Sequence, residues 1–234
     1  MHLRDLTQFL AELSDNNNRA WFAMNRPRYD ILRAEFLELV TELIAGIAAF
    51  DPPVAGCDPK KALFRINRDL RFSKEKRPYK TSFSASILPS GRKKPSEGGG
   101  PVYYFVINAS GQLDFGAGEY MPPAYRLRSV REHIATDAHG FGKLLKDRKL
   151  HAAFGGFYEE GKLTRPPKGF TADLPHIEHI KLKSYFVWKE TALNLNAPDA
   201  ISTILLAGFR AAYPLITWLR SVPALELPLP DKEK

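Results

Sequence analysis

The chain has 234 residues, of which 44% are hydrophobic, 12% aromatic and 26% charged, so it can bury a substantial core and is neither disordered nor fibrous. Its one cysteine, Cys57, excludes an internal disulfide framework and a thiolate metal cluster built from this chain alone. The first residues lack the pattern of an export signal. The longest apolar candidate, residues 39–50, is interrupted by Glu42 and is shorter than the roughly 18 residues of a membrane span. We therefore expect a cytoplasmic protein without membrane contact.

The positive charge of the chain is local. The formal net charge is +8, yet residues 60–94 hold twelve lysines and arginines against only Asp69 and Glu75, a net charge of +10. The other residues hold 22 basic and 24 acidic side chains, a net charge of −2. Attraction to anions is therefore expected of one segment and not of the whole surface.

The N-terminal part is predicted to be helical. Apolar residues at helical spacing predict a helix around residues 6–13, and the asparagines at 16–18 end it and cap a short helix over 19–24. A longer helix is predicted from Pro27 to Ile47, because apolar residues recur there at steps of three and four.

The following part is predicted to be extended. Residues 63–72 alternate, with Arg65 and Arg71 on the polar face, whereas Arg68 falls on the apolar face. Three further strands are predicted at residues 82–88, 102–107 and 113–117, which form a β-meander. Residues 89–101 are rich in Gly, Pro and Ser and lack apolar anchors, so we expect a mobile basic loop there.

The C-terminal part returns to helices. A helix is predicted after Pro122-Pro123, followed by shorter helical pieces at 141–145 and 150–154, and by a strand over 181–188. The last helix is predicted to start at Pro198 and to be kinked or restarted by Pro214, with a loose tail from residue 223. The fold class predicted is α+β, a single domain over residues 1–234 in which an antiparallel β-meander packs against N-terminal and C-terminal helices.

The basic segment contains a long composite motif, R-x-x-R-D-x-R-F followed by K-x-x-Y. This motif resembles the signature of a bacterial family of about this length, domain of unknown function 2461. The resemblance extends to Asn-Asn and Trp21-Phe22 near the start, Gly116-Ala117-Gly118, Met121-Pro122 and the Pro-Pro-Lys-Gly run at 166–169. Glu75 departs from the pattern, in which Asp or Asn precedes the lysine. The resemblance implies no activity, cofactor or catalytic residue. The matching positions are Arg65, Arg68, Asp69, Arg71, Phe72, Lys76 and Tyr79.

Arginines at this density suit the capture of an anion, because a planar guanidinium can bind phosphate or carboxylate through two parallel hydrogen bonds. Asp69 could hold one guanidinium while another meets the ligand. The alternative is an ion-pair lattice that only stabilises the fold, in which Arg68 needs a carboxylate or carbonyl partner because an unpaired buried charge is costly. The predicted ligand-binding residues are Arg65, Arg68, Asp69, Arg71, Lys76, Tyr79 and Lys80.

Small residues recur on neighbouring predicted strands. They could form a shallow floor beside the arginines, with the basic loop at 92–94 folding over it. The favoured alternative is that small residues only let helices pack closely against the sheet. These small residues are Ser82, Ser84, Ser86, Gly116 and Gly118.

Other motifs carry less weight. The pair His176 and His179 has no second ligand cluster, so no metal and no cofactor are predicted. Residues 115–118 lack the third glycine of a phosphate-binding turn. Cys57 has no histidine partner in a recognisable signature. Asp69 with Tyr79 and Lys76 could supply acid–base chemistry, although the sequence does not decide whether the protein is an enzyme.

Three functions follow, in order of preference. The first is a site for a small anionic ligand that bears phosphate or carboxylate groups. The second is nucleic-acid binding by the same basic segment, with Phe72, Tyr79, Tyr103 or Tyr104 as stacking surfaces. The third is a structural or interaction module whose Arg/Asp motif only stabilises its own fold.

Overall fold

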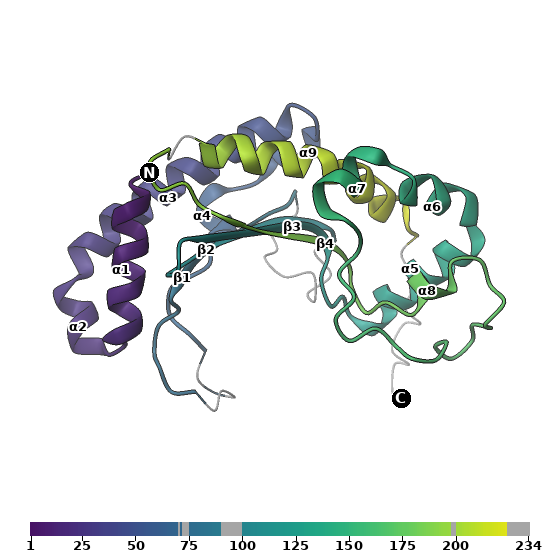
Figure 1. Cartoon of the computed structure of the whole chain (residues 1–234), viewed down its shortest axis with the longest axis horizontal. Helices are drawn as coiled ribbons and strands as arrows, with labels where there is room; N and C mark the ends of the chain where they lie inside the picture. Colours follow the sequence, from purple (N-terminus) through teal and green to yellow (C-terminus); the bar gives the residue numbers. More distant parts are fainter. Residues whose placement is uncertain (70, 72–74, 90–99, 198–199, 224–234) are drawn as a thin grey trace, which may run out of the picture.

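The computed structural model describes residues 1–69, 71, 75–89, 100–197 and 200–223. Figure 1 shows an arch: a sheet lies at its centre, α1 and α2 form one end, α5–α8 form the other, and α3 and α9 cover one face of the sheet. The helical elements are α1 (Leu3–Asp15), α2 (Arg19–Met24), α3 (Arg26–Ala48), η1 (Pro52–Gly56, a 3₁₀ helix), α4 (Pro59–Ala62), α5 (Ala124–Thr136), α6 (Ala138–Leu145), α7 (Arg148–Phe154), α8 (Ile177–Ile180) and α9 (Ala200–Ser221). The strands are β1 (Ser82–Ile87), β2 (Val102–Asn108), β3 (Gln112–Glu119) and β4 (Tyr185–Ala192).

The sheet confirms the predicted meander. Its order is β1-β2-β3-β4, and every neighbouring pair is antiparallel. Side chains alternate between its two faces. The covered face carries buried aromatic and aliphatic residues such as Phe83, Phe105 and Phe115, which belong to one large apolar cluster with α3 and α9. The fold class predicted from the sequence, α+β with helices from both ends of the chain against a meander, is therefore correct.

The N-terminal helices form where their apolar spacing predicts them. Leu6, Leu10 and Leu13 are fully buried along one side of α1. The side chain of Asn18 accepts a hydrogen bond from the backbone of Trp21 at 2.9 Å, which satisfies an otherwise unpaired donor at the start of α2. The asparagine run therefore separates and caps these helices as predicted.

Helix α9 crosses the covered face of the sheet, and a glycine sets how closely it approaches. A Cβ at Gly208 would lie 2.3 Å from Cε2 of Phe115, so only glycine lets this ring pack under the helix. The helix also continues through Pro214, which contradicts the predicted restart. Because Pro214 removes a backbone donor, the carbonyl one turn earlier lacks its usual partner, yet eight residues of the helix are buried in the core and hold it together.

By length and composition, α9 is also the one helix in the described residues that could cross a membrane. The sequence prediction concerned uninterrupted apolar runs, whereas α9 contains Ser202, Thr203 and Arg210 and is apolar enough only on average. One side of α9 is buried against β3 and α3.

Two buried ion pairs join distant parts of the fold. Asp51, fully buried, accepts hydrogen bonds from Arg220 Nη1 at 2.6 Å and Nη2 at 2.9 Å, and from the hydroxyl of Tyr103 at 2.9 Å. Glu119 accepts hydrogen bonds from Nε and Nη2 of Arg126, and Arg126 also donates to the carbonyl of Leu219 at 2.6 Å. Both pairs therefore fasten the C-terminal end of α9 to the rest of the molecule.

Two strand predictions need correction. Residues 63–72 form no strand in their described part, where isolated bridges join Leu63 to Ala85 and Asn67 to Tyr79. The alternation is real, but this segment pairs mainly with the returning chain and so never becomes a sheet strand. The strand predicted at 181–188 instead spans Tyr185–Ala192, because the backbone of Leu182 is still bonded to His179 at the end of α8.

Some predictions fall outside the described residues. They concern most of the loop at 89–101, Phe72 of the motif, the helix start at Pro198 and nearly all of the tail from 223.

Candidate functional site

The basic motif forms an arm of two chain segments that run beside each other, here called the basic arm, made of the described residues between 65 and 80. Its two sides meet through hydrogen bonds from Arg68 N to Pro78 O at 2.9 Å and from Lys80 N to Ile66 O at 2.8 Å. At its base, Phe64 N donates to Ser84 O of β1 at 3.0 Å. Figure 1 shows the arm projecting from β1 away from the covered face of the sheet.

The base of the arm is fastened to the N-terminal helices. The side-chain amide of Asn17 donates to Tyr79 O and accepts from Tyr79 N, both at 3.0 Å. The ring of Tyr79 stacks on Phe22 with centroids 4.1 Å apart, and only 8% of Tyr79 is exposed. Three segments of the family resemblance, Asn-Asn, Trp21-Phe22 and K-x-x-Y, therefore meet at one anchor. Tyr79 contributes to this anchor through its backbone and its ring.

Within the arm, Arg71 is paired with Asp69. Its Nε donates to Oδ1 at 3.0 Å and its Nη2 to Oδ2 at 2.7 Å, and its backbone N–H donates to Oδ1 at 3.2 Å. The guanidinium holds the pKa of Asp69 well below its usual range. Both side chains are exposed, at 77% and 44%. Asp69 therefore orients Arg71 at the surface, as one of the sequence-based alternatives predicts.

A second cluster surrounds Glu75. Its carboxylate accepts hydrogen bonds from Arg68 and from Arg77, and the Arg68 bond is the largest cause of a lowered pKa of Glu75. Arg68 is 25% exposed, and of the two kinds of partner predicted for it, a carboxylate or a carbonyl, Glu75 supplies the carboxylate. The residue that departs from the family pattern thus bridges two arginines.

The other predicted cations are Arg65, Lys76 and Lys80. Arg65 and Lys76 are exposed, and Arg65 forms no ion pair with any described residue. The ammonium of Lys80 lies 5.1 Å from the centroid of Phe64, a cation–π contact at the base of the arm. Arg65 lies near enough to Asp69 to help lower the pKa of that carboxylate, while Arg68 and Arg71 are paired with different acids. The described residues of the exposed arm carry six basic and two acidic side chains.

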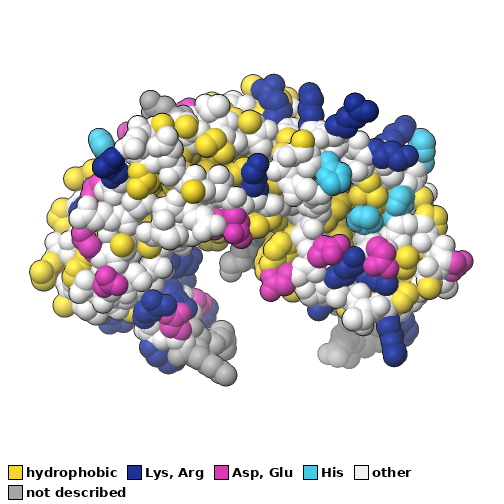
Figure 2. All heavy atoms as spheres, viewed as in Figure 1, with side chains coloured by type: hydrophobic (Ala, Val, Ile, Leu, Met, Phe, Trp, Pro, Cys, Tyr) yellow, Lys and Arg dark blue, Asp and Glu magenta, His cyan; other side chains and the backbone are white. Residues whose placement is uncertain are grey.

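An aromatic row extends from the base of the arm over the uncovered face of the sheet. Phe64 meets Tyr104 edge-on with centroids 6.0 Å apart, and Tyr104 stacks on Trp188 at 6.1 Å. Burial raises the pKa of Asp114 on the same face, and the neighbouring Glu190 adds to the shift. Figure 2 shows the molecule deeply hollowed below the sheet, with dark blue side chains near the end of the arch that bears the arm.

The small residues share the uncovered face, as the strand register places Ser84, Ser86 and Gly116 beside the row. They do not form an open floor, because Ser84 and Ser86 are 7% and 1% exposed. A Cβ at Gly116 would lie 2.1 Å from Val187 O and 2.5 Å from the ring of Phe186. Gly116 therefore permits close packing, but the neighbours are strand β4 and its aromatic side chain instead of a helix. The same placement inside a strand excludes a phosphate-binding turn there.

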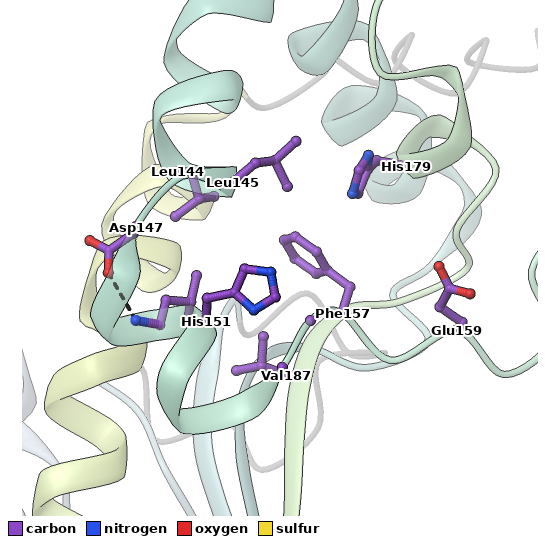
Figure 3. Close-up of a pocket in the computed structure, with 11 residues that line it drawn as sticks. Leu144, Leu145, Asp147, His151, Phe157, Glu159, His179 and Val187 are labelled. Atoms are coloured by element: carbon purple, nitrogen blue, oxygen red, sulfur yellow. Dashed lines mark hydrogen bonds between the residues drawn. The ribbon is translucent and has the colours of Figure 1, made fainter.

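A pocket of about 370 Å³ lies at the other end of the arch, among α6, α7, α8 and β4 (Figure 3). His151 and His179 line it together with apolar side chains such as Leu144, Phe157 and Val187. No described residue of the basic motif reaches it. The sequence positions of these two histidines do not predict that they share a pocket, because only the tertiary fold brings α7 beside α8.

His179 is the most perturbed group of this pocket. Its ring packs edge-on against Phe141 and Phe157, and its Nδ1 is buried without a hydrogen-bond partner among the described residues. Burial lowers the pKa of His179, and the nearby His176 adds to the shift. His176 instead bonds Ala138 O through Nε2 at 2.9 Å. Across the described part of the chain, no three His, Cys, Asp or Glu side chains gather as metal ligands do.

Cys57 lies in the core between η1 and α4. It is 5% exposed, and burial raises the pKa of its thiol. A protonated, buried thiol is a poor nucleophile, so its placement favours a packing role.

Fold and site together define an α+β protein with an antiparallel meander and an exposed basic arm. A separate pocket is lined by apolar side chains, two histidines and two carboxylates. Residues 5–218 match the sequence profile of the family described as conserved hypothetical protein (DUF2461), and the chain belongs to this family. No curated protein and no solved structure matches the chain.

Proposed function

We propose that the chain binds the phosphate groups of an extended anionic ligand on the basic arm. The observation that carries the proposal is the exposed, net positive arm held at a rigid base. Because Asn17 and Phe22 fix Tyr79, the base of the arm is held in place before a ligand binds, which favours affinity.

An open surface suits an extended ligand better than an enclosed small one. The cavity at the base of the arm, between Tyr29, Arg33 and Phe64, measures only about 10 Å³. Enclosed ligand sites are typically several hundred Å³. We therefore assign the contacts to exposed cations, mainly Arg65, Arg71 and Lys76, with Asp69 orienting Arg71.

One further observation favours single-stranded nucleic acid as that ligand. The row Phe64–Tyr104–Trp188 begins at the base of the arm, and aromatic side chains next to a basic track are the common device for stacking bases beside bound phosphates. Phosphate contacts would come from the arm and stacking from the row.

The test measures binding of two probes, a labelled oligothymidylate and inorganic polyphosphate, at increasing salt. We compare the double variant Arg65→Ala/Lys76→Ala with Arg148→Ala/Lys149→Ala, which removes the same charge from exposed positions on α7. Only the arm variant should bind markedly more weakly. For oligothymidylate, its slope of log affinity against log salt should become shallower by about 0.7 for each phosphate that the variant no longer neutralises.

A gain-of-affinity variant makes the test two-sided. Glu75→Gln removes one acid from the arm without shortening the side chain, so both probes should bind more tightly. Oligothymidylate binding well above polyphosphate binding would support stacking on the aromatic row. If wild type binds neither probe at low salt, or both double variants lose affinity equally, the arm only stabilises the fold and the proposal fails.

A further inference from the structure

The pocket at the α6–α8 end of the arch is a built cavity. Its volume of about 370 Å³ lies within the range of small-molecule sites. Leu144, Leu150, Phe157 and Val187 supply apolar walls from separate elements. Figure 3 shows the ring of His151 facing Phe157 across this space.

Local hydrogen bonds hold the walls in place. Asp147 accepts from Leu150 N at 2.8 Å and caps α7, and Gly155, with φ of 76°, ends the helix by donating to His151 O at 2.8 Å. Phe157 then bridges to Val187 of β4. A Cβ on Gly155 or Gly156 would meet nothing within 4 Å. The cavity is therefore preformed, and Gly155 and Gly156 border it without contributing side chains.

The charge of the pocket is opposite to that of the basic arm. Its lining includes two carboxylates, Asp147 and Glu159, and no Lys or Arg among the described residues. Burial lowers the pKa of His179 and so disfavours its charged form. The carboxylate of Asp147 is already used to cap α7. Glu159 is 64% exposed, and its Oε1 accepts from Lys162 at 2.9 Å.

We propose that this pocket binds a small organic amine with an apolar body. The body lies against Leu144, Leu150 and Phe157, and the ammonium group lies at the Glu159 end. No Lys or Arg is among the described lining residues, and the nearby Lys162 is already paired with Glu159 and Glu178, so the phosphate and carboxylate ligands that suit the arm bind weakly here. The imidazole of His179 borders the same end and offers the hydrogen bond that orients the polar group. This site is independent of the function proposed for the arm.

The test uses three probes with nearly the same shape: phenethylamine, phenethyl alcohol and phenylacetate. Their affinities for the full chain are measured by calorimetry, and NMR shifts locate the residues that respond. We expect the amine to bind most tightly, the alcohol less tightly and phenylacetate least. The responding amides should be those of α7, residues 155–159 and β4.

Matched variants assign the polar contact. Glu159→Gln should lower the affinity for phenethylamine about fivefold, a modest loss because the carboxylate is partly solvated. The affinity for phenethyl alcohol should not change. Asp147→Asn is the control, since Asn caps a helix as well as Asp does and the same charge is removed. His179→Phe keeps a ring against Phe141 and Phe157 and should weaken both the amine and the alcohol.

Several results would overturn the proposal. They are the absence of binding for all three probes, phenylacetate binding at least as tightly as the amine, or amine affinity unchanged in Glu159→Gln. Equal losses of affinity in Glu159→Gln and Asp147→Asn would also contradict the assigned position of the ammonium. Melting temperatures of the variants are measured alongside. If His179→Phe does not fold, the Glu159→Gln and Asp147→Asn pair still decides the outcome.

Discussion

The side-chain amide of Asn17 hydrogen-bonds both backbone polar groups of Tyr79, 62 residues further along the chain. An amide imitates a neighbouring strand here, because it offers one donor and one acceptor at the spacing of a backbone unit. The turn between α1 and α2 thereby fixes the base of the basic arm. The motif that carries the family resemblance thus depends on a residue outside it.

Asn17→Ala should loosen the arm. Two part-buried hydrogen bonds are removed, so we expect the free energy of unfolding to fall by about 1–2 kcal/mol. Trypsin should also cleave between residues 65 and 80 faster than in wild type, because the basic side chains there become more accessible to the protease. Urea denaturation and a digestion time course measure both effects. Gln8→Ala, which removes an exposed hydrogen bond on α1, is the control and should behave like wild type.

Arg220→Met should destabilise the protein strongly. It leaves the carboxylate of Asp51 buried with only the hydroxyl of Tyr103 as a side-chain partner among the described residues, and an unpaired buried charge costs about 3 kcal/mol or more. Tyr103→Phe removes a single hydrogen bond and should cost only about 1 kcal/mol. Chemical denaturation of both variants checks the order. Equal losses of stability would show that the ion pair contributes little.

Gly116→Ala should disrupt the pairing of β3 with β4. Its Cβ would lie 2.1 Å from the carbonyl oxygen of Val187, and backbone cannot move aside as a flexible side chain can. We expect a loss of about 3 kcal/mol, measured by thermal and urea unfolding. Gly56→Ala serves for comparison, since its Cβ meets nothing within 4 Å and should change stability by less than about 0.5 kcal/mol. A stable Gly116→Ala protein would contradict the packing described for the uncovered face.

The titration of His179 should make stability depend on pH. Its folded-state pKa lies below the ordinary value of 6.5, so the unfolded chain binds more protons in the interval beneath 6.5. The free energy of unfolding should therefore fall as pH drops through 6.5 and level off above the pH at which the unfolded histidine has lost its proton. Denaturation across this interval measures the slope. The slope should be smaller in His179→Phe, whereas an identical slope would assign it to other groups.

Local patterns in the sequence predict most elements of this fold correctly. The apolar spacing of α1 and α3 and the alternation of β1, β2 and β3 identify the elements, and the short turn between β2 and β3 favours antiparallel pairing of these two strands. The segment at 63–72 alternates as clearly as β1 does, yet it becomes an arm, because alternation does not reveal which chain lies alongside. The predicted start of β4 is too early because the last turn of α8 competes for the same residues.

For the candidate sites, the order of residues is enough to locate the positive charge and to indicate that Arg68 requires a carboxylate or carbonyl partner. The three-dimensional packing is needed to show that Arg68 forms an ion pair with Glu75 and Arg71 with Asp69. It is also needed to show that Asn17 anchors Tyr79 and that His151 and His179 share a pocket. The difference arises because composition and spacing set charge and local conformation. Contacts between residues tens of positions apart depend on how the whole core packs, and no local pattern contains that information.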